Sequence, residues 1–224
     1  MRAPISVIVP TLNAEHQLGA CLTALMPGLE AGLIRELIVT DGGSDDATLA
    51  IARAWGAETV EGPASRGGQL ARGCAQAQGM WLLVLHADTV LQEGWVAAVV
   101  KHLETHEAGW FKLRFAQGGT AGRIVAGWAN LRSRLGLPYG DQGLLIPRAL
   151  YSDVGGYPDQ PLMEDVAIAR ALRGRLRALD AIALTSPARY HRQGWLRRGA
   201  HNIWTLMRYF GGASPHQLAE SYRR

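Results

Sequence analysis

Acidic side chains follow two apolar segments of the chain, at positions where they could bind a metal ion. Asp41 follows the apolar run LIVT and precedes two glycines, whereas His86 and Asp88 follow the apolar run WLLVL. Side chains two positions apart at a strand end point to the same side, so His86 and Asp88 can share a face. Oxygen ligands suit Mg²⁺ or Mn²⁺, which commonly bridge a protein carboxylate and substrate phosphates. The pattern therefore predicts a divalent-metal site beside Asp88.

Other polar segments are each open to two interpretations. Asp41 could accept hydrogen bonds from a base or ribose, or it could belong to a tight turn in which Ser44 caps the helix that follows. Glu164 and Asp165 open a predicted helix, where the helix dipole favours acids whatever the function. Arg66 begins the glycine-rich segment RGGQLARG at the start of another predicted helix, a natural place for phosphate binding.

The elements that would position these side chains alternate between strand and helix. Strands are predicted at 5–9, 37–40, 57–62 and 81–85, and helices at 16–26, 45–55, 66–78 and 94–106. Such alternation predicts an α/β fold with a mostly parallel sheet and helices on both faces. Ligands of these sheets bind beyond the carboxyl ends of the strands, where Asp41 and Asp88 are expected.

The composition indicates one globular domain. The chain has 224 residues, 48% of them apolar, without repeats or low-complexity segments. No apolar run is long enough to span a bilayer, and the N-terminal run is too short for a signal peptide. The two cysteines, Cys21 and Cys74, fall in predicted helices, so we expect reduced thiols and a cytoplasmic protein.

Positive charge is concentrated toward the C-terminus. Residues 1–165 have a net charge of −5 and residues 166–224 a net charge of +9. The predicted helix at 195–210 carries Arg197 and Arg198 together with an apolar side. One interpretation is that this side docks on the domain while the arginines reach a diphosphate. The other is peripheral contact with an anionic membrane. The pI of about 9.4 also suggests nucleic acid, but no nucleic-acid-binding module surrounds these residues, so we expect none.

The order of motifs resembles a known family. VIVPTLN, DGGSDD, RGGQLARG, LHAD and GGYPDQPLMED, followed by a basic C-terminal helix, are similar to family 2 glycosyltransferases of GT-A fold. The resemblance covers essentially the whole chain. Its compactness makes the sequence most similar to a small bacterial branch associated with arsenosugar biosynthesis.

The resemblance implies a single GT-A-like, Rossmann-like domain. It would have a nucleotide-binding half at 1–106, an acceptor and catalytic half at 107–185 and a basic helical segment at 186–224. It further implies inverting transfer of a sugar from a UDP- or GDP-sugar to an acceptor hydroxyl, with Mg²⁺ or Mn²⁺. The residues that would contact the donor are Pro10, Thr11, Asp41, Arg66, Arg197 and Arg198.

The resemblance also suggests roles for the acidic residues. Asp165 matches the catalytic base, with Glu164 beside it. Asp88 matches the metal-binding aspartate of a DXD motif whose first aspartate is here His86, and His191 is a further candidate ligand. The QxxRW signature of processive synthases is absent, which makes such an enzyme an unlikely match.

Two alternatives remain. A nucleotidyltransferase would be expected to have a glycine-rich phosphate loop after the first strand, where this chain has Pro10-Thr11-Leu12-Asn13. A non-catalytic nucleotide-sugar-binding module would not need a base, yet both Asp88 and Asp165 are retained.

Overall fold

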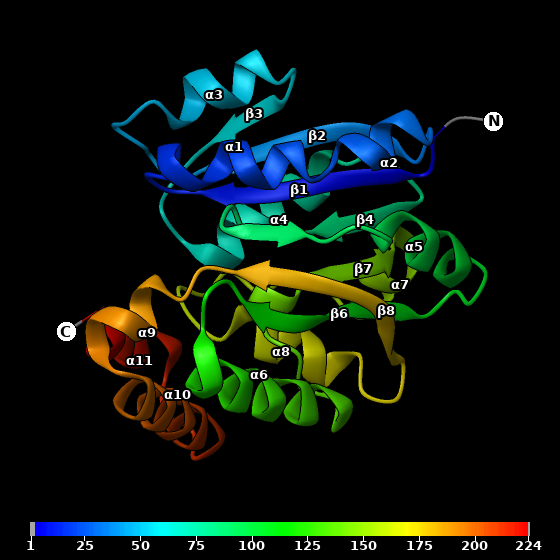
Figure 1. Ribbon diagram of the computed structural model, residues 1–224. Helices are drawn as coiled ribbons and strands as arrows, with labels where there is room; N and C mark the ends of the chain where they lie inside the picture. Colours follow the sequence, from blue (N-terminus) through cyan, green and yellow to red (C-terminus); the bar gives the residue numbers. More distant parts are fainter. Residues whose placement is uncertain (1–2, 224) are drawn as a thin grey trace.

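The computed structural model describes residues 3–223 and contains one eight-stranded sheet (Figure 1). The strands are β1 (Ile5–Thr11), β2 (Ile34–Asp41), β3 (Glu58–Glu61), β4 (Trp81–Val84), β5 (Thr89–Leu91), β6 (Ala108–Phe115), β7 (Leu144–Pro147) and β8 (Leu176–Thr185). Their order across the sheet is β3-β2-β1-β4-β7-β6-β8-β5. Only β7 and β5 run antiparallel to their neighbours. The predicted α/β class with a mostly parallel sheet is confirmed.

Helices cover both faces of this sheet. They are α1 (Glu15–Thr23), α2 (Met26–Glu30), α3 (Thr48–Ala54), α4 (Arg66–Gln76), α5 (Trp95–Leu103), α6 (Gly119–Arg134), α7 (Arg148–Asp153), α8 (Glu164–Ala171), α9 (Ala188–Gln193), α10 (Trp195–Phe210) and α11 (Pro215–Arg223), with a 3₁₀ turn, η1 (Gly140–Gln142). Val7 and Val9 of β1 pack in the apolar cluster that includes residues of α1, α3 and α5. Ile8 packs in the cluster that includes residues of α4, α7 and α8. Because β1 is buried on both faces, its sequence is a continuous apolar run.

The turn after β2 is organised by Asp41, which is fully buried. Thr11 Oγ1 donates to Asp41 Oδ1 (2.8 Å), and the amides of Gly43 and Ser44 donate to Oδ2 (2.8 and 2.6 Å). Ser44 Oγ also donates to Asp41 Oδ1 (2.6 Å). The prediction that Ser44 caps the following helix is wrong, since its hydroxyl is used here and α3 begins only at Thr48, after Ala47.

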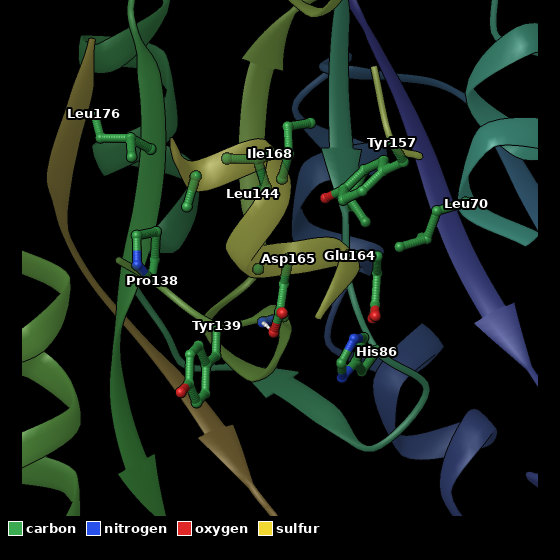
Figure 2. Close-up of a pocket in the computed structure, with 14 residues that line it drawn as sticks. Leu70, His86, Pro138, Tyr139, Leu144, Tyr157, Glu164, Asp165, Ile168 and Leu176 are labelled. Carbon is green, nitrogen blue, oxygen red and sulfur yellow. Dashed lines mark hydrogen bonds between the residues drawn. The ribbon is translucent and has the colours of Figure 1, made fainter. Parts of the chain in front are cut away.

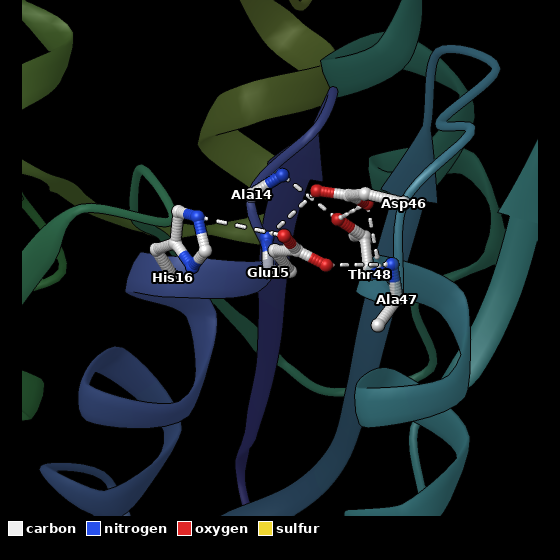
Figure 3. A network of polar contacts seen from close by, with 6 residues as sticks. All are labelled: Ala14, Glu15, His16, Asp46, Ala47 and Thr48. Atoms are coloured by element: carbon white, nitrogen blue, oxygen red, sulfur yellow. Dashed lines mark hydrogen bonds and ion pairs between the residues drawn. The ribbon is translucent and has the colours of Figure 1, made fainter.

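The start of α1 is capped by residues of the loop after β2 (Figure 3). The Glu15 amide donates to Asp46 Oδ2 (3.1 Å), and the Ala14 amide donates to Thr48 Oγ1 (2.7 Å). In return, Glu15 Oε2 accepts from the Ala47 amide (3.0 Å). These bonds satisfy amides that a helix start leaves without partners, and they fix the loops after β1 and β2 to one another.

These contacts predict that Asp41 contributes strongly to stability. Burial alone would raise the pKa of Asp41, but hydrogen bonds from Ser44 and Thr11 lower it below its ordinary value by stabilising the charged form. We expect Asp41→Asn to lower the free energy of unfolding by roughly 2 kcal/mol at neutral pH. Because the folded-state pKa is depressed, the loss should shrink as the pH falls below about 4.

Urea unfolding of both proteins across this pH range measures the effect. Asp45→Asn is the matched control, because Asp45 is exposed in the same turn. Equal stabilities of the Asp41 variant and the wild type at neutral pH would contradict the structural role.

Only part of the predicted apolar side of α10 docks on the domain. Trp195 and Leu206 pack against apolar clusters of the domain, as expected. Trp204 and Met207 are instead exposed, so for them the expectation is wrong. The physical reason is that the inner side of α10 also lines a polar cleft, where Arg198 is held by a polar partner.

No helix among residues 3–223 combines the length and the apolar character that crossing a membrane requires.

Candidate functional site

A cleft of about 700 Å³ opens beyond the carboxyl ends of β1 and β4. Its walls come from segments far apart in the sequence. They include Pro10–Ala14, Ser65 and Arg66, His86–Asp88, Tyr139–Asp141, Pro161–Asp165, Ser186, Arg189, Arg198 and Tyr222. The cleft therefore lies beyond the carboxyl ends of the strands, where the alternation of strands and helices predicts a ligand site.

The ends of β1 and β2 are held together by one buried glutamine. Gln69 Nε2 donates to the carbonyl oxygens of Thr11 (2.7 Å) and Thr40 (2.8 Å). Pro10 and Thr11 line the cleft, as expected for residues near a nucleoside, but Asp41 does not. Asp41 instead holds Thr11 in place through its side-chain hydrogen bond.

The glycine-rich start of α4 packs against another loop. The Gly67 amide donates to the Gln160 carbonyl (3.0 Å), and a Cβ on Gly67 would lie 1.9 Å from the Pro158 carbonyl oxygen. The Gly68 amide is used by Ser65 Oγ (3.4 Å). These amides are therefore not free to bind a phosphate. The glycines instead allow close packing of α4 on the loop that leads into α8.

Arg66 is the group of this segment that reaches the cleft. Burial alone would lower its pKa, but the negative charges of Glu164 and Asp165 raise the pKa above its ordinary value. Its guanidinium remains charged in every relevant condition and suits an anionic ligand.

His86 and Asp88 both line the cleft, but they do so from the turn between β4, which ends at Val84, and β5, where the alternation of a strand no longer applies. A Cβ on Gly140 would lie 2.4 Å from His86 Nε2, so the imidazole packs directly on that glycine. Burial and the charge of Arg66 lower the pKa of His86, which favours the neutral ring. Asp88 accepts no hydrogen bond from the described residues and keeps its oxygens available.

Asp88 and His86 are the candidate ligands for a divalent ion in the cleft. Residues 3–223 contain no cluster of three or more His, Cys, Asp or Glu side chains placed to bind a metal. The available set is the Asp88 carboxylate with the His86 imidazole beside it. Magnesium-like ions are commonly held by one or two carboxylates and completed by substrate phosphates. The residues therefore fit an ion that arrives with a diphosphate.

Glu164 and Asp165 lie at the start of α8, across a small pocket from His86 (Figure 2). Asp165 Oδ2 accepts from the Gly140 amide (2.9 Å) and Oδ1 from the Val166 amide (2.7 Å), which fixes its orientation. Glu164 is almost fully buried, and neither carboxyl oxygen has a partner among the described residues. Burial and the neighbouring Asp165 raise the pKa of Glu164.

Residues 139–141 were missed by the sequence analysis. Asp141 lines the cleft, and burial raises its pKa to about 6. Tyr139 stacks on the guanidinium of Arg132, whose Cζ lies 3.1 Å from the ring centroid. The available signal was an aspartate between glycines in the segment GDQG, directly ahead of the apolar run LLIP.

The C-terminal segment provides a different set of cations from the predicted one. Arg198 is buried, lines the cleft, and donates to Gln193 Oε1 (3.1 Å) and to the Tyr222 hydroxyl. Arg189, which the sequence analysis missed, also lines the cleft. Arg197 and His191 are exposed and are not among the cleft-lining residues. The structure does not bring His191 to His86 and Asp88, because its ring packs edge-on against Trp195.

Comparison with known proteins gives sequence relatives over part of the chain. The model of glycosyl transferase family 2 matches residues 6–141, which is more than half of the chain. A PGL/p-HBAD biosynthesis glycosyltransferase of Mycobacterium tuberculosis is 35% identical over 116 residues, covering 48% of this chain and 44% of the relative. The match thus spans less than half the length of this relative.

Solved structures show the same fold. TarS 1–349 of S. aureus aligns with a TM-score of 0.63 at 19% identity, covering 91% of this chain and 64% of that structure. Glucosyl-3-phosphoglycerate synthase from Mycobacterium tuberculosis, in complex with Mn²⁺ and UDP-glucose, aligns with a TM-score of 0.56 at 23% identity, covering 82% and 69%. Together with the family match, these similarities identify the chain as a member of glycosyl transferase family 2.

Proposed function

We propose that this protein transfers a sugar from a nucleoside-diphosphate donor to an acceptor hydroxyl, with inversion at the anomeric carbon. The observation that carries the proposal is the single cleft that contains the Asp88 carboxylate, the Arg66 guanidinium and the Asp165 carboxylate. Complexes of TarS with UDP-GlcNAc and of the mycobacterial synthase with Mn²⁺ and UDP-glucose support a UDP-sugar as the donor.

The proposed donor site lies mainly in the half formed by residues 1–106 and takes one cation from the C-terminal segment. Pro10 and Thr11 would contact the nucleoside, in a position fixed by Asp41 from behind. Arg66 would donate charge-assisted hydrogen bonds to the diphosphate, and Arg198 would be the second cation. A divalent ion held by Asp88, with His86 beside it, would neutralise charge on the departing diphosphate. Arg197 and His191 have no role in this proposal because they lie outside the cleft.

The proposed catalytic residue lies in the half formed by residues 107–185. Asp165 would accept the proton of the acceptor hydroxyl as that oxygen attacks the anomeric carbon and the nucleoside diphosphate leaves. Its two backbone hydrogen bonds occupy one lone pair on each oxygen, which leaves further lone pairs for the proton. Glu164 is a poorer base in this geometry, because it is almost completely buried.

A thermal-shift panel tests the donor. UDP, GDP and ADP are compared in the presence of Mn²⁺ or EDTA. Saturation at about 100 times the dissociation constant adds roughly 2.7 kcal/mol of stability, which corresponds to a rise of about 5–10 °C for a chain of this size. We expect this rise for UDP with Mn²⁺ and a smaller one with EDTA. The absence of a rise for every nucleotide would overturn the proposal.

A further inference from the structure

Two helices direct apolar side chains toward solvent on one end of the molecule. On α10, Leu196 is 91% and Trp204 59% exposed, and on α6, Trp128 is 52% exposed. We call this surface the α6–α10 face. Its apolar members are Ile124, Trp128, Leu131, Leu135, Leu196, Ile203, Trp204, Met207 and Phe210.

The apolar members recur at a helical spacing on each helix. Ile124, Trp128, Leu131 and Leu135 fall on one side of α6, while the small side chains of its other side pack inward. On α10 the inward side holds the buried Arg198 and Thr205 and the partly buried Leu206 and Tyr209. Amphipathic helices normally bury the apolar side, yet here an exposed apolar stripe on each helix has no partner among residues 3–223.

The two stripes belong to one surface. Helices α6 and α10 lie side by side at the same end of the molecule in Figure 1. Trp195, the first residue of α10, packs on the start of α6. A Cβ on Gly122 would lie 3.0 Å from the Trp195 ring. The face therefore spans both helices.

The charged side chains of the two helices themselves all have one sign. Neither α6 nor α10 contains an aspartate or glutamate. Four of their arginines are exposed or half-buried: Arg123, Arg134, Arg197 and Arg208. Exposed tryptophans and leucines interspersed with arginines are typical of helices that lie in the plane of an anionic membrane. A second copy of the chain fits less well, because a symmetric contact would oppose arginines to arginines.

We propose that the α6–α10 face docks on an anionic membrane surface. Docking does not depend on the proposed function. The inner side of α10 lines the cleft through Arg198 and Asn202, so docking would hold the cleft about one helix diameter, roughly 10 Å, from the lipid. An acceptor hydroxyl carried by a lipid would then lie near Asp165, a consequence that does rest on the proposed function.

Vesicle sedimentation tests the docking. The protein is mixed with vesicles of phosphatidylcholine alone or of phosphatidylcholine with phosphatidylglycerol. We expect binding to the anionic vesicles and at least about tenfold weaker binding for the double variant Trp128→Gln/Trp204→Gln. Arg123→Gln/Arg197→Gln should weaken binding to anionic vesicles by roughly fivefold per arginine, and added salt should do the same.

Trp55→Gln/Met80→Gln is the matched control, since Trp55 and Met80 are exposed apolar residues outside the face. This variant should bind vesicles like the wild type. The Trp128/Trp204 variant should keep its melting temperature and its UDP-dependent shift, because neither residue lines the cleft. The proposal is overturned if the wild type stays in the supernatant or if the Trp128/Trp204 and Trp55/Met80 variants bind vesicles equally. A concentration-dependent dimer that the Trp128/Trp204 variant loses would instead assign the face to a second copy.

Discussion

Replacing Asp165 by asparagine is expected to leave the donor bound and remove most of the turnover. Asparagine has nearly the same shape but cannot accept the acceptor proton, and general-base catalysis is typically worth about 10²–10⁴-fold. The donor contacts at Pro10, Thr11 and Arg66 lie on other segments of the cleft and should be preserved. We therefore expect a loss in kcat of about 10²–10⁴-fold, with a small change in donor affinity.

The measurement is release of the nucleoside diphosphate from sugar nucleotides that carry the base identified by the thermal-shift panel, with water or an added alcohol as acceptor. Melting temperatures should accompany it, because Asp165 also accepts hydrogen bonds from Gly140 and Val166. Asp153→Asn is the matched control, an exposed aspartate at the end of α7 that does not line the cleft. Wild-type turnover in the Asp165 variant, with loss in Glu164→Gln, would move the base to Glu164.

Replacing Asp88 by alanine is expected to abolish the dependence of nucleotide affinity on metal. Asp88 is the carboxylate at the end of β4, and the described residues donate no hydrogen bond to it. A divalent ion held by Asp88 would add nucleotide affinity that EDTA removes. Loss of an outer-shell group that only orients a metal ligand typically costs about 10–100-fold in metal affinity, so loss of the proposed ligand Asp88 should lower the affinity measured with Mn²⁺ by at least about tenfold.

Calorimetric titration of UDP and GDP with Mn²⁺ or EDTA measures this effect. The Asp88 variant with Mn²⁺ should bind no more tightly than the wild type with EDTA. Glu93→Ala is a control for the loss of one acidic side chain, because Glu93 is exposed and does not line the cleft. Identical affinities of wild type and the Asp88 variant under both conditions would refute the metal role.

Part of this molecule followed from the sequence alone. The period and composition of the strands gave the α/β class, because a strand buried on both faces must be continuously apolar. The strand ends then placed Asp88 beside a ligand cleft, since parallel strands gather their carboxyl ends at one edge. These are local rules, and they hold whatever the distant neighbours are. His86 also lines the cleft, but from the turn that follows β4, where the alternation of a strand does not apply.

Only the tertiary structure decided the roles that depend on partners distant in the chain. The sequence suggested that Asp41 binds a ligand. In the structure its carboxylate instead accepts a buried hydrogen bond from the hydroxyl of Thr11, which lies thirty residues earlier in the chain. The glycines after Arg66 suggested a phosphate-binding loop. In the structure Gly67 instead packs so closely against the loop at Pro158 and Gln160 that a side chain would not fit. Asp141 lines the cleft because the pairing of β7 with β4 brings the turn that precedes β7 to the cleft.

The orientation of α10 shows the physical reason most directly. Helical periodicity determines that Arg197 and Arg198 lie about 100° apart around the axis, so they cannot both point at one ligand. It does not determine which side turns inward, because that depends on what the helix packs against. Here the inner side faces a polar cleft that holds Arg198, and the apolar side with Trp204 remains at the surface. The sequence therefore determined that the helix is amphipathic, and the tertiary contacts decided which side is buried.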